Sequence, residues 1–379
     1  MISGTRQELT NLQTADLLAD SSGREENLLP LVGRTAAELE DLAAEMKQPR
    51  FRGRQLSRWI YHRCAGDFDR MSDLPLTFRE ELKRRFQLGH PEMLQHLRSR
   101  DGSIKYLLQY GDRVAIEAVY LPFGRYVSAC LSSQAGCAAG CRFCATALGG
   151  FQRNLTAGEI IGQLLAIQSD APSRIGHIVY MGMGEPLFNL DAVIQSVRLL
   201  RAEMGISVRN ITISTVGVVP GIQRLAEEGL PVTLALSLHA ADDEIRSQLI
   251  PTGRKWPLAE ILSACRTYYE RTGRRLTFEY ILLEGINDSP EQARALGKRL
   301  AGLPGNVNLI PYNPVPGAPY RRPSSSRIQA FRDELEKMGR AATQRMTRGL
   351  DVNAACGQLR LQAADLPATN LALSAGARQ

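Results

Sequence analysis

Short apolar strands alternate with amphipathic helices from Tyr126 onward, and this alternation limits the folds open to the chain. The predicted strands are Val127–Ser132, His177–Met181, Asn210–Ser214, Val232–Leu238, Thr277–Leu283 and Asn306–Pro311. The predicted helices are residues 156–169, 191–203, 219–228, 257–271, 289–301 and 325–339. Repeated strand–helix units of this length imply a parallel sheet with right-handed crossovers. Six units are too few for a closed eight-stranded barrel, so we expect an α/β fold, an open (βα)6 partial TIM barrel with its active groups at the carboxyl ends of the strands.

A small helical region precedes this barrel. Its predicted helices run from Thr35, which forms a capping box with Glu38, to about Met46, then over Gln55–Cys64 and Phe78–Phe86. Residues 47–100 carry 13 basic and 6 acidic side chains, whereas residues 1–46 carry 9 acidic and 3 basic ones. The net charge of +7 is therefore concentrated here, which favours a polyanionic partner; a solvated helical surface is the alternative.

A change of period separates the helical region from the barrel. Ile104–Tyr110 and Val114–Leu121 are rich in β-branched and aromatic residues and predict a hairpin whose polar side chains point away from a small core. The predicted organisation is a disordered leader at 1–28, a basic helical domain at 29–95, a hairpin linker at 96–122, the barrel at 123–345, a C-terminal catalytic loop at 346–360 and a flexible tail at 361–379.

Composition indicates the cellular compartment. No apolar run approaches the ~20 residues that span a bilayer, and the polar, acidic N-terminus resembles neither a signal peptide nor a transit peptide. Seven cysteines without a secretory signal indicate a reducing compartment with metal-binding or catalytic thiols. We therefore expect a cytoplasmic protein without a membrane partner.

Three thiols follow the first barrel strand within eight residues: Cys137, Cys141 and Cys144. Thiolates are the soft ligands of iron–sulfur clusters, and a [4Fe–4S] cluster normally takes four of them, so three local ligands would leave one iron open. Zinc would need a second ligand pair, which the sequence lacks, and a disulfide knot would need an extracellular chain. Chance core cysteines are disfavoured by the glycine and charge between them, so the motif predicts a cluster.

Polar groups also follow the later strands. Two glycines at 182 and 184 precede Glu185 and allow the backbone to approach a ligand closely. Further candidates at strand ends are Ser214, Ser237, Leu238, His239 and Asn313. Each of these residues, taken alone, is more simply explained as a helix cap or a polar group of a loop. Because all of them lie at the ends of strands, together they favour a ligand site that binds a ribose, a carboxylate and an adenine.

Four cysteines lie outside the motif. Cys64 and Cys265 fall on apolar helix faces and are expected to be core residues. Cys130 lies on the first barrel strand, and Cys356 lies in a glycine-containing loop that no core would favour. Two such thiols beside a cluster suggest covalent chemistry.

The sequence resembles the adenine methyltransferases of the RlmN/Cfr family, radical S-adenosylmethionine (SAM) enzymes that methylate ribosomal RNA. The matching motifs are SSQAGC at 132–137, the cysteine motif with Phe143, GFQRNL at 150–155, MGMGEP at 181–186, SLHA at 237–240, LIPYNP at 309–314 and AACGQL at 354–359. The resemblance covers about residues 30 to 360. Ala135 and Val216 are minor departures, at positions where Val and Ser are common.

The resemblance implies one [4Fe–4S] cluster per chain, whose open iron holds the amino and carboxylate groups of SAM, and two SAM molecules per turnover. Glu185 and backbone carbonyls would bind the SAM ammonium. In the family route Cys356 takes a methyl group from one SAM, and a 5′-deoxyadenosyl radical from the second removes hydrogen from that S-methyl group. The methylene adds to the adenine, Glu117 accepts the ring proton, and Cys130 attacks the Cys356 sulfur to release the product as a transient disulfide.

The family further implies the partners. These are 23S rRNA, the tRNA that carries the adenine beside the anticodon, and an external one-electron reductant such as flavodoxin or ferredoxin, with the basic helical domain gripping RNA phosphates. Two alternatives to adenine-C2 methylation stay open: C8 methylation of 23S rRNA, as in the Cfr branch that gives antibiotic resistance, and a [4Fe–4S] protein that binds RNA or transfers electrons without methyl transfer.

Overall fold

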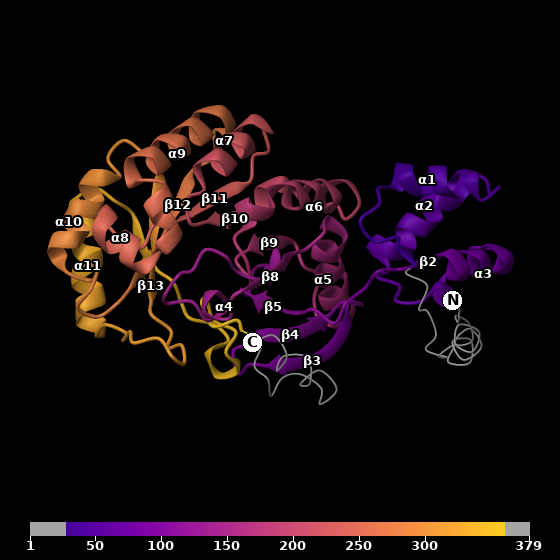
Figure 1. Ribbon diagram of the computed structural model, residues 1–379, viewed down its shortest axis with the longest axis horizontal. Helices are drawn as coiled ribbons and strands as arrows, with labels where there is room; N and C mark the ends of the chain where they lie inside the picture. The colour runs from indigo at the N-terminus through magenta and orange to yellow at the C-terminus, as the bar shows by residue number, and fades with distance from the viewer. Residues whose placement is uncertain (1–27, 361–379) are drawn as a thin grey trace, which may run out of the picture.

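The computed structural model describes residues 28–360 (Figure 1). The predicted leader and tail fall on residues 1–27 and 361–379, outside the described part. A helical region lies at one end of the molecule and the barrel lies at the other (Figure 1). Among the described residues, no helix is long and apolar enough to cross a membrane.

One ten-stranded mixed sheet forms the centre of the molecule, in the order β14-β13-β12-β11-β10-β9-β6-β5-β4-β3. Its parallel part contains β6 (Val127–Cys130), β9 (His177–Tyr180), β10 (Ile211–Thr215), β11 (Thr233–Ser237), β12 (Leu276–Leu282), β13 (Gly305–Pro311) and β14 (Ala342–Gln344). The six predicted strands are confirmed, because each is apolar and bounded by turn residues. The seventh, β14, was not predicted; it is short and polar, and only its pairing with β13 makes it a strand.

Helices cover the outside of the parallel strands (Figure 1). They are α5 (Ala157–Asp170), α6 (Leu190–Ala202), α7 (Val219–Glu227), α9 (Leu258–Thr272), α10 (Pro290–Arg299) and α11 (Ser325–Lys337), with the short α4 (Ala145–Leu148) and α8 (Asp243–Leu249) inserted. The six predicted helices are confirmed within about two residues, and Thr156 and Glu159 form a capping box at the start of α5. The expected α/β partial barrel is therefore present.

The N-terminal region contains α1 (Ala36–Glu45), α2 (Phe51–Ser57), a π-helical turn (Arg58–His62) and α3 (Leu76–Arg85), with a small parallel pair β1 (Leu29–Pro30) and β2 (Phe86–Gln87). The Thr35–Glu38 capping box is present. Buried Glu203, which follows α6, accepts hydrogen bonds from Ala36 N and Ser57 Oγ, both at 2.9 Å, and so attaches the helices to the barrel. Cys64 lies beyond the helix end, at φ +47°, so its predicted position on a helix face was wrong; it is partly buried and packs against the hydrophobic core.

The predicted hairpin is part of the main sheet rather than a separate linker. β3 (Glu92–Arg98), β4 (Ile104–Gln109) and β5 (Ala115–Pro122) are antiparallel, and β5 pairs with β6. The expectation that its polar side chains point away from the core was wrong for Lys105 and Glu117, which are buried and joined by an ion pair of 2.7 Å. β4 and β5 are buried because both faces of this part of the sheet are covered. On one face the Tyr106 hydroxyl donates to the Asp170 carboxylate of α5, and the other face is continuous with the barrel interior through the pairing of β5 with β6.

Candidate active site

The cysteine loop is held between two short strands at the carboxyl end of β6. β7 (Gln134–Gly136) pairs with β8 (Phe151–Asn154), and the intervening loop carries the three motif cysteines. Backbone bonds fix its conformation: Cys137 N donates to Gly150 O at 2.8 Å, and Cys144 N donates to Cys141 O at 3.2 Å. Ala145 N donates to Gly357 O at 2.7 Å, which ties this loop to the C-terminal segment.

All three motif cysteines line one cavity of about 150 Å³ at the carboxyl ends of the strands. Burial raises the pKa of Cys137 to about 12 and raises those of Cys141 and Cys144, so nearby positive charge is needed to make them thiolates. Within residues 28–360, no three His, Cys, Asp or Glu side chains are placed as ligands of a single metal ion. Because each thiolate of an iron–sulfur cluster binds a different iron, soft donors spread around one cavity fit a cluster.

The glycine-rich turn after β9 presses closely against the cysteine loop. Gly184 has φ +104°, and a Cβ there would lie 2.7 Å from the Cβ of Gln134, so only glycine fits. Glu185 N donates to Gln134 Oε1 at 2.8 Å. The Glu185 carboxylate is buried and accepts from Leu187 N at 3.1 Å and Val216 N at 2.8 Å. Burial raises its pKa to about 7, and its position inside the cavity is fixed.

Three more predicted residues line the same cavity. Ser214 and Ser237 end adjacent strands, and their hydroxyls lie 3.3 Å apart. His239, at φ +60°, accepts from Ile281 N at Nδ1, at 3.1 Å, and burial lowers its pKa to about 3, so the imidazole is neutral. These groups offer hydroxyls and a neutral ring to a ligand, while Arg345 adds a guanidinium group to the same cavity lining.

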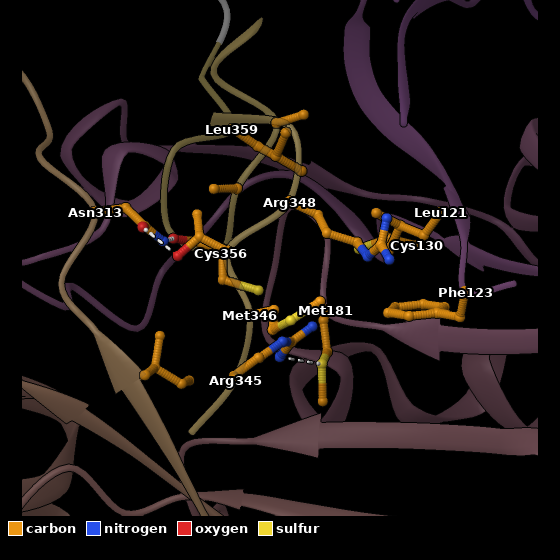
Figure 2. Close-up of a pocket in the computed structure, with 14 residues that line it drawn as sticks. Leu121, Phe123, Cys130, Met181, Asn313, Arg345, Met346, Arg348, Cys356 and Leu359 are labelled. Atoms are coloured by element: carbon orange, nitrogen blue, oxygen red, sulfur yellow. Dashed lines mark hydrogen bonds between the residues drawn. The ribbon is translucent and has the colours of Figure 1, made fainter. Parts of the chain in front are cut away.

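Two predicted residues lie elsewhere. Leu238 is fully buried, and its carbonyl accepts from Arg246 Nε at 3.2 Å. Asn313 lines a neighbouring cavity, where its Nδ2 donates to Cys356 O at 3.2 Å (Figure 2). Arg246, which the sequence analysis did not select, also donates to Val216 O, and burial lowers its pKa to about 10. It is therefore a cation that fixes two strand ends behind the cavity.

Cys130 and Cys356 line the same cavity, a space of about 40 Å³ (Figure 2). Cys356 also lines the neighbouring cysteine-motif cavity. Burial and, less strongly, the charge of Cys356 raise the pKa of Cys130 to about 12, and the charge of Arg345 opposes the shift. All seven cysteines are free thiols. A thiol placed between two cavities can meet one ligand on each side.

Arg345 lines both cavities, and the sequence analysis missed it; Arg348 is a second cation in the lining of the cavity of Cys130 and Cys356. Arg345 lies below the Cys356 side chain, with Nη1 at 3.6 Å from Met181 Sδ and 3.8 Å from the Glu279 carboxylate (Figure 2). The charge of Cys356 raises the pKa of Arg345. No sequence signal marks it, because Arg345 follows β14, a strand that only tertiary pairing reveals.

Glu117 lies on the barrel-facing side of β5. Val119 pairs with Cys130, so Glu117, two residues before Val119, shares the face that carries Cys130. Its carbonyl accepts from Ser132 Oγ at 2.6 Å, and its carboxylate pairs with Lys105. The linings of the two cavities above do not include Glu117.

Two family models match the chain. The model described as the radical SAM superfamily matches residues 131–296, which hold the cysteine loop and most of the barrel. The model described as the ribosomal RNA large subunit methyltransferase N-terminal domain matches residues 29–88, the helical region.

Full-length relatives extend this match. A probable dual-specificity RNA methyltransferase RlmN of Symbiobacterium thermophilum is 49% identical over 341 residues, covering 88% of this chain and 92% of the relative. The protein of that name from Thermus thermophilus is 48% identical over 329 residues, covering 86% and 93%. The crystal structure of a radical SAM methyltransferase from Sphaerobacter thermophilus superposes with a TM-score of 0.85 at 45% identity, covering 88% of this chain and 99% of that one. With the cysteine loop, the barrel and the helical region all matched, the chain belongs to the RlmN family of radical SAM methyltransferases.

Proposed function

We propose that this protein methylates C2 of an adenine in 23S rRNA, and of the adenine beside the tRNA anticodon, through an S-methylcysteine at Cys356. The observation that carries the proposal is the position of Cys356, which lines both the cysteine-motif cavity and the cavity shared with Cys130. Relatives named as dual-specificity RNA methyltransferases support the substrate class.

The cysteine-motif cavity would hold the cofactors. Cys137, Cys141 and Cys144 would ligate a [4Fe–4S] cluster, and Gly184 and Glu185 would receive the ammonium of SAM. Ser214, Ser237 and His239 would face the rest of SAM. When bound, these groups supply an electron and a carbon-centred radical, with two SAM molecules used per turnover.

Cys356 has the role of methyl carrier. Its sulfur accepts a methyl group by displacement and presents it toward the second cavity. That space of about 40 Å³ is little larger than one water molecule, so it would have to open to admit the target adenine. C2 of adenine is electron-poor and does not attack a sulfonium methyl group directly. The carrier thiol instead holds the methyl group where one of its hydrogens can be removed, so that the remaining methylene carbon can add to C2. The Asn313 and Ala145 hydrogen bonds to the Cys356–Gly357 backbone hold the carrier in place.

Cys130 has the role of resolving thiol. Its thiolate attacks the Cys356 sulfur, so that an S–S bond forms, the S–C bond breaks, and the bonding electron pair stays on the carbon, which is protonated to a methyl group. Arg345, whose charge acts on both thiols, supplies positive charge to the attacking thiolate. An external reductant then restores both thiols.

Glu117 is our candidate for the acceptor of the C2 proton. It shares the barrel face of Cys130, and Lys105 at 2.7 Å stabilises its carboxylate form in a buried setting. The support for this role is that Glu117 and Cys130 lie on the same face of the sheet, although Glu117 lines neither of the two cavities.

The RNA partner has a candidate surface on the helical region. Arg54, Arg58, Arg63 and Arg70 are exposed there, although Arg54 also pairs with Glu40 at 2.9 Å. Exposed guanidinium groups suit phosphate contacts. An enzyme with ribosomal RNA and tRNA substrates, and a flavodoxin or ferredoxin as electron donor, would work in the cytoplasm.

Mass spectrometry of modified adenines tests the function. Anaerobically reconstituted protein is incubated with protein-free 23S rRNA or tRNA, SAM and a reductant, and the nucleosides are analysed. We expect 2-methyladenosine with wild-type protein and none with Cys356→Ala, while Cys265→Ala, a buried cysteine of α9, serves as the matched control. An 8-methyladenosine product would assign the chain to C8 methylation, and RNA binding without either product would favour a non-catalytic protein.

A further inference from the structure

The segment that carries Cys356 is attached to the rest of the molecule on both sides of this residue. On the downstream side, Asn313 Nδ2 donates to Cys356 O at 3.2 Å. On the upstream side, residues 348–351 lie against the turn between β3 and β4, which is formed by residues 99–103 (Figure 1). The function proposed for the thiols assigns no role to this upstream attachment.

Two aspartates make the upstream attachment reciprocal. Ser99 Oγ donates to Asp351 Oδ1 at 2.6 Å, and Arg100 N donates to Asp351 Oδ2 at 3.2 Å. In the opposite direction, Gly349 N donates to Asp101 Oδ2 at 2.9 Å. Each carboxylate thus accepts a hydrogen bond from a backbone N–H of the other segment. We call these five residues the latch.

The β3–β4 turn is a rigid support for the latch. Ser99 N donates to Ser103 O at 2.8 Å, and Gly102 N donates to Ser99 O at 3.1 Å. Gly102 has φ +84°, and a Cβ there would lie 3.2 Å from Pro122 Cγ, at the end of β5. Because β5 pairs with β6, which carries Cys130, the turn has a fixed place relative to that thiol.

The other half of the latch belongs to a compact turn that leads directly into Cys356. Ala354 N donates to Gly349 O at 2.8 Å. Gly349 has φ +65°, and a Cβ there would lie 2.7 Å from the Cβ of Ala354, so the two residues are in close contact. Ala354 and Cys356 line the same cavity. A displacement of Asp351 would therefore be transmitted through this turn to Cys356.

Apolar packing holds the upstream half of the segment only weakly. Met346 is 74% exposed and Leu350 is 44% exposed, and Val352 is only partly buried against the core. Exposed side chains gain little from the hydrophobic effect, because little of their surface is removed from water. The hydrogen bonds of the latch therefore determine where this half of the segment lies.

We propose that Asp351 is a positioning residue, which through the latch holds Cys356 where its sulfur can accept a methyl group. This inference rests on the proposed function. In the step concerned, Cys356 gives up its proton to solvent and its sulfur bonds to the methyl carbon. The C–S bond of the sulfonium breaks, and its electron pair stays on the departing sulfur. Such a displacement needs the attacking sulfur in line with the breaking bond, and a misplacement of about 1 Å can cost about 100-fold in rate.

Replacement of Asp351 tests the latch through the rate at which Cys356 gains a methyl group. Anaerobically reconstituted protein is incubated with SAM in the absence of RNA, and the methyl load on Cys356 is followed by protein mass spectrometry. We expect Asp351→Ala to slow loading roughly 2- to 10-fold, the range for loss of one hydrogen bond. Asp351→Asn keeps one acceptor for the Ser99 hydroxyl and should be intermediate. Asp191→Asn, at an exposed aspartate of α6, is the matched control and should load like wild type.

A second variant tests whether the effect passes through the bond to Ser99. Ser99→Ala should also slow loading. The double variant Ser99→Ala with Asp351→Ala should be no slower than Asp351→Ala, because both changes remove the same hydrogen bond. Multiplied effects in the double variant would overturn the assignment of the latch to this contact.

Alkylation by iodoacetamide without SAM separates a loosened segment from a general loss of reactivity. This reagent arrives from solvent, so loss of the latch should make Cys356 react roughly 2- to 10-fold faster while methyl loading becomes slower. Cys64, a partly buried thiol of the helical region, is the internal reference and should not change.

The two rates together decide the proposal. Wild-type rates of loading and alkylation in Asp351→Ala would overturn it, as would slower loading without faster alkylation of Cys356. If the wild-type protein gains no methyl group at Cys356, the proposed function fails, while the alkylation comparison still decides whether the latch holds this thiol.

Discussion

Replacement of Gly184 by alanine tests whether the glycine-rich turn holds SAM. A Cβ at this position would lie 2.7 Å from Gln134 Cβ and 2.8 Å from Gln134 N, and φ is +104°. A non-glycine residue in such a conformation costs about 1–3 kcal/mol. Gln134 cannot move away independently, because it is paired in β7 and its Oε1 accepts from Glu185 N. Relief of the contact must therefore displace Glu185.

Displacement of Glu185 should weaken SAM binding. A hydrogen bond to a charged group contributes about 1.5–3 kcal/mol, so we expect the Kd for SAM to rise roughly 10- to 150-fold. The strain itself should lower Tm by roughly 1–4 °C, because the unfolding entropy of a chain of 379 residues corresponds to about 1.3 °C per kcal/mol. Isothermal titration calorimetry of the reconstituted protein measures the first quantity and scanning calorimetry the second.

Gly176→Ala is the matched control for this substitution. Gly176 directly precedes the same strand, β9, at its other end, and a Cβ there would meet no atom within 4 Å. It should leave both SAM affinity and Tm close to wild type. A Gly184→Ala protein that binds SAM as tightly as Gly176→Ala would refute the assignment of this turn to SAM.

Three further predictions concern the thiols and the buried ion pair. Cys130→Ala should stop after one turnover and accumulate an RNA–protein adduct at Cys356, visible as a shifted band on a denaturing gel; free product at wild-type yield would contradict a resolving role. The pKa of Cys130 is raised to about 12, so its thiolate fraction should rise about tenfold per pH unit between pH 7 and 9. The single-turnover rate of product release should rise in the same proportion. Arg345→Met removes the charge that lowers this pKa and should slow release at each pH. A pH-independent release rate would show that Cys130 attack does not limit release. Lys105→Met leaves the Glu117 carboxylate buried without its cation and should lower the free energy of unfolding by about 3–5 kcal/mol, whereas Lys105→Met combined with Glu117→Gln should recover most of that loss in a denaturant titration.

Features that depend on neighbouring residues could be predicted from the amino-acid sequence. The six parallel strands and their helices were predicted correctly because apolar runs, turn residues and capping boxes such as Thr156–Glu159 act over a few positions. The cysteine motif and the turn at Gly184 were also visible, because the ligands and the close-approach glycines are contiguous in the chain. Their meeting in one cavity followed from the rule that the carboxyl ends of parallel strands share an edge.

The side chains that surround Cys356 could not be predicted from the sequence, because tertiary contacts bring them together. Arg345 follows a strand defined by pairing with β13, and Asn313 reaches the carrier segment across 43 positions of the chain. Lys105 and Glu117 are buried because β5 joins β6 and so turns a predicted surface hairpin into a wall of the barrel. The ring contact of Tyr126 with His177 likewise joins the β5–β6 turn to the start of β9. Such contacts depend on which distant strands lie side by side, and local residue patterns carry no record of that arrangement.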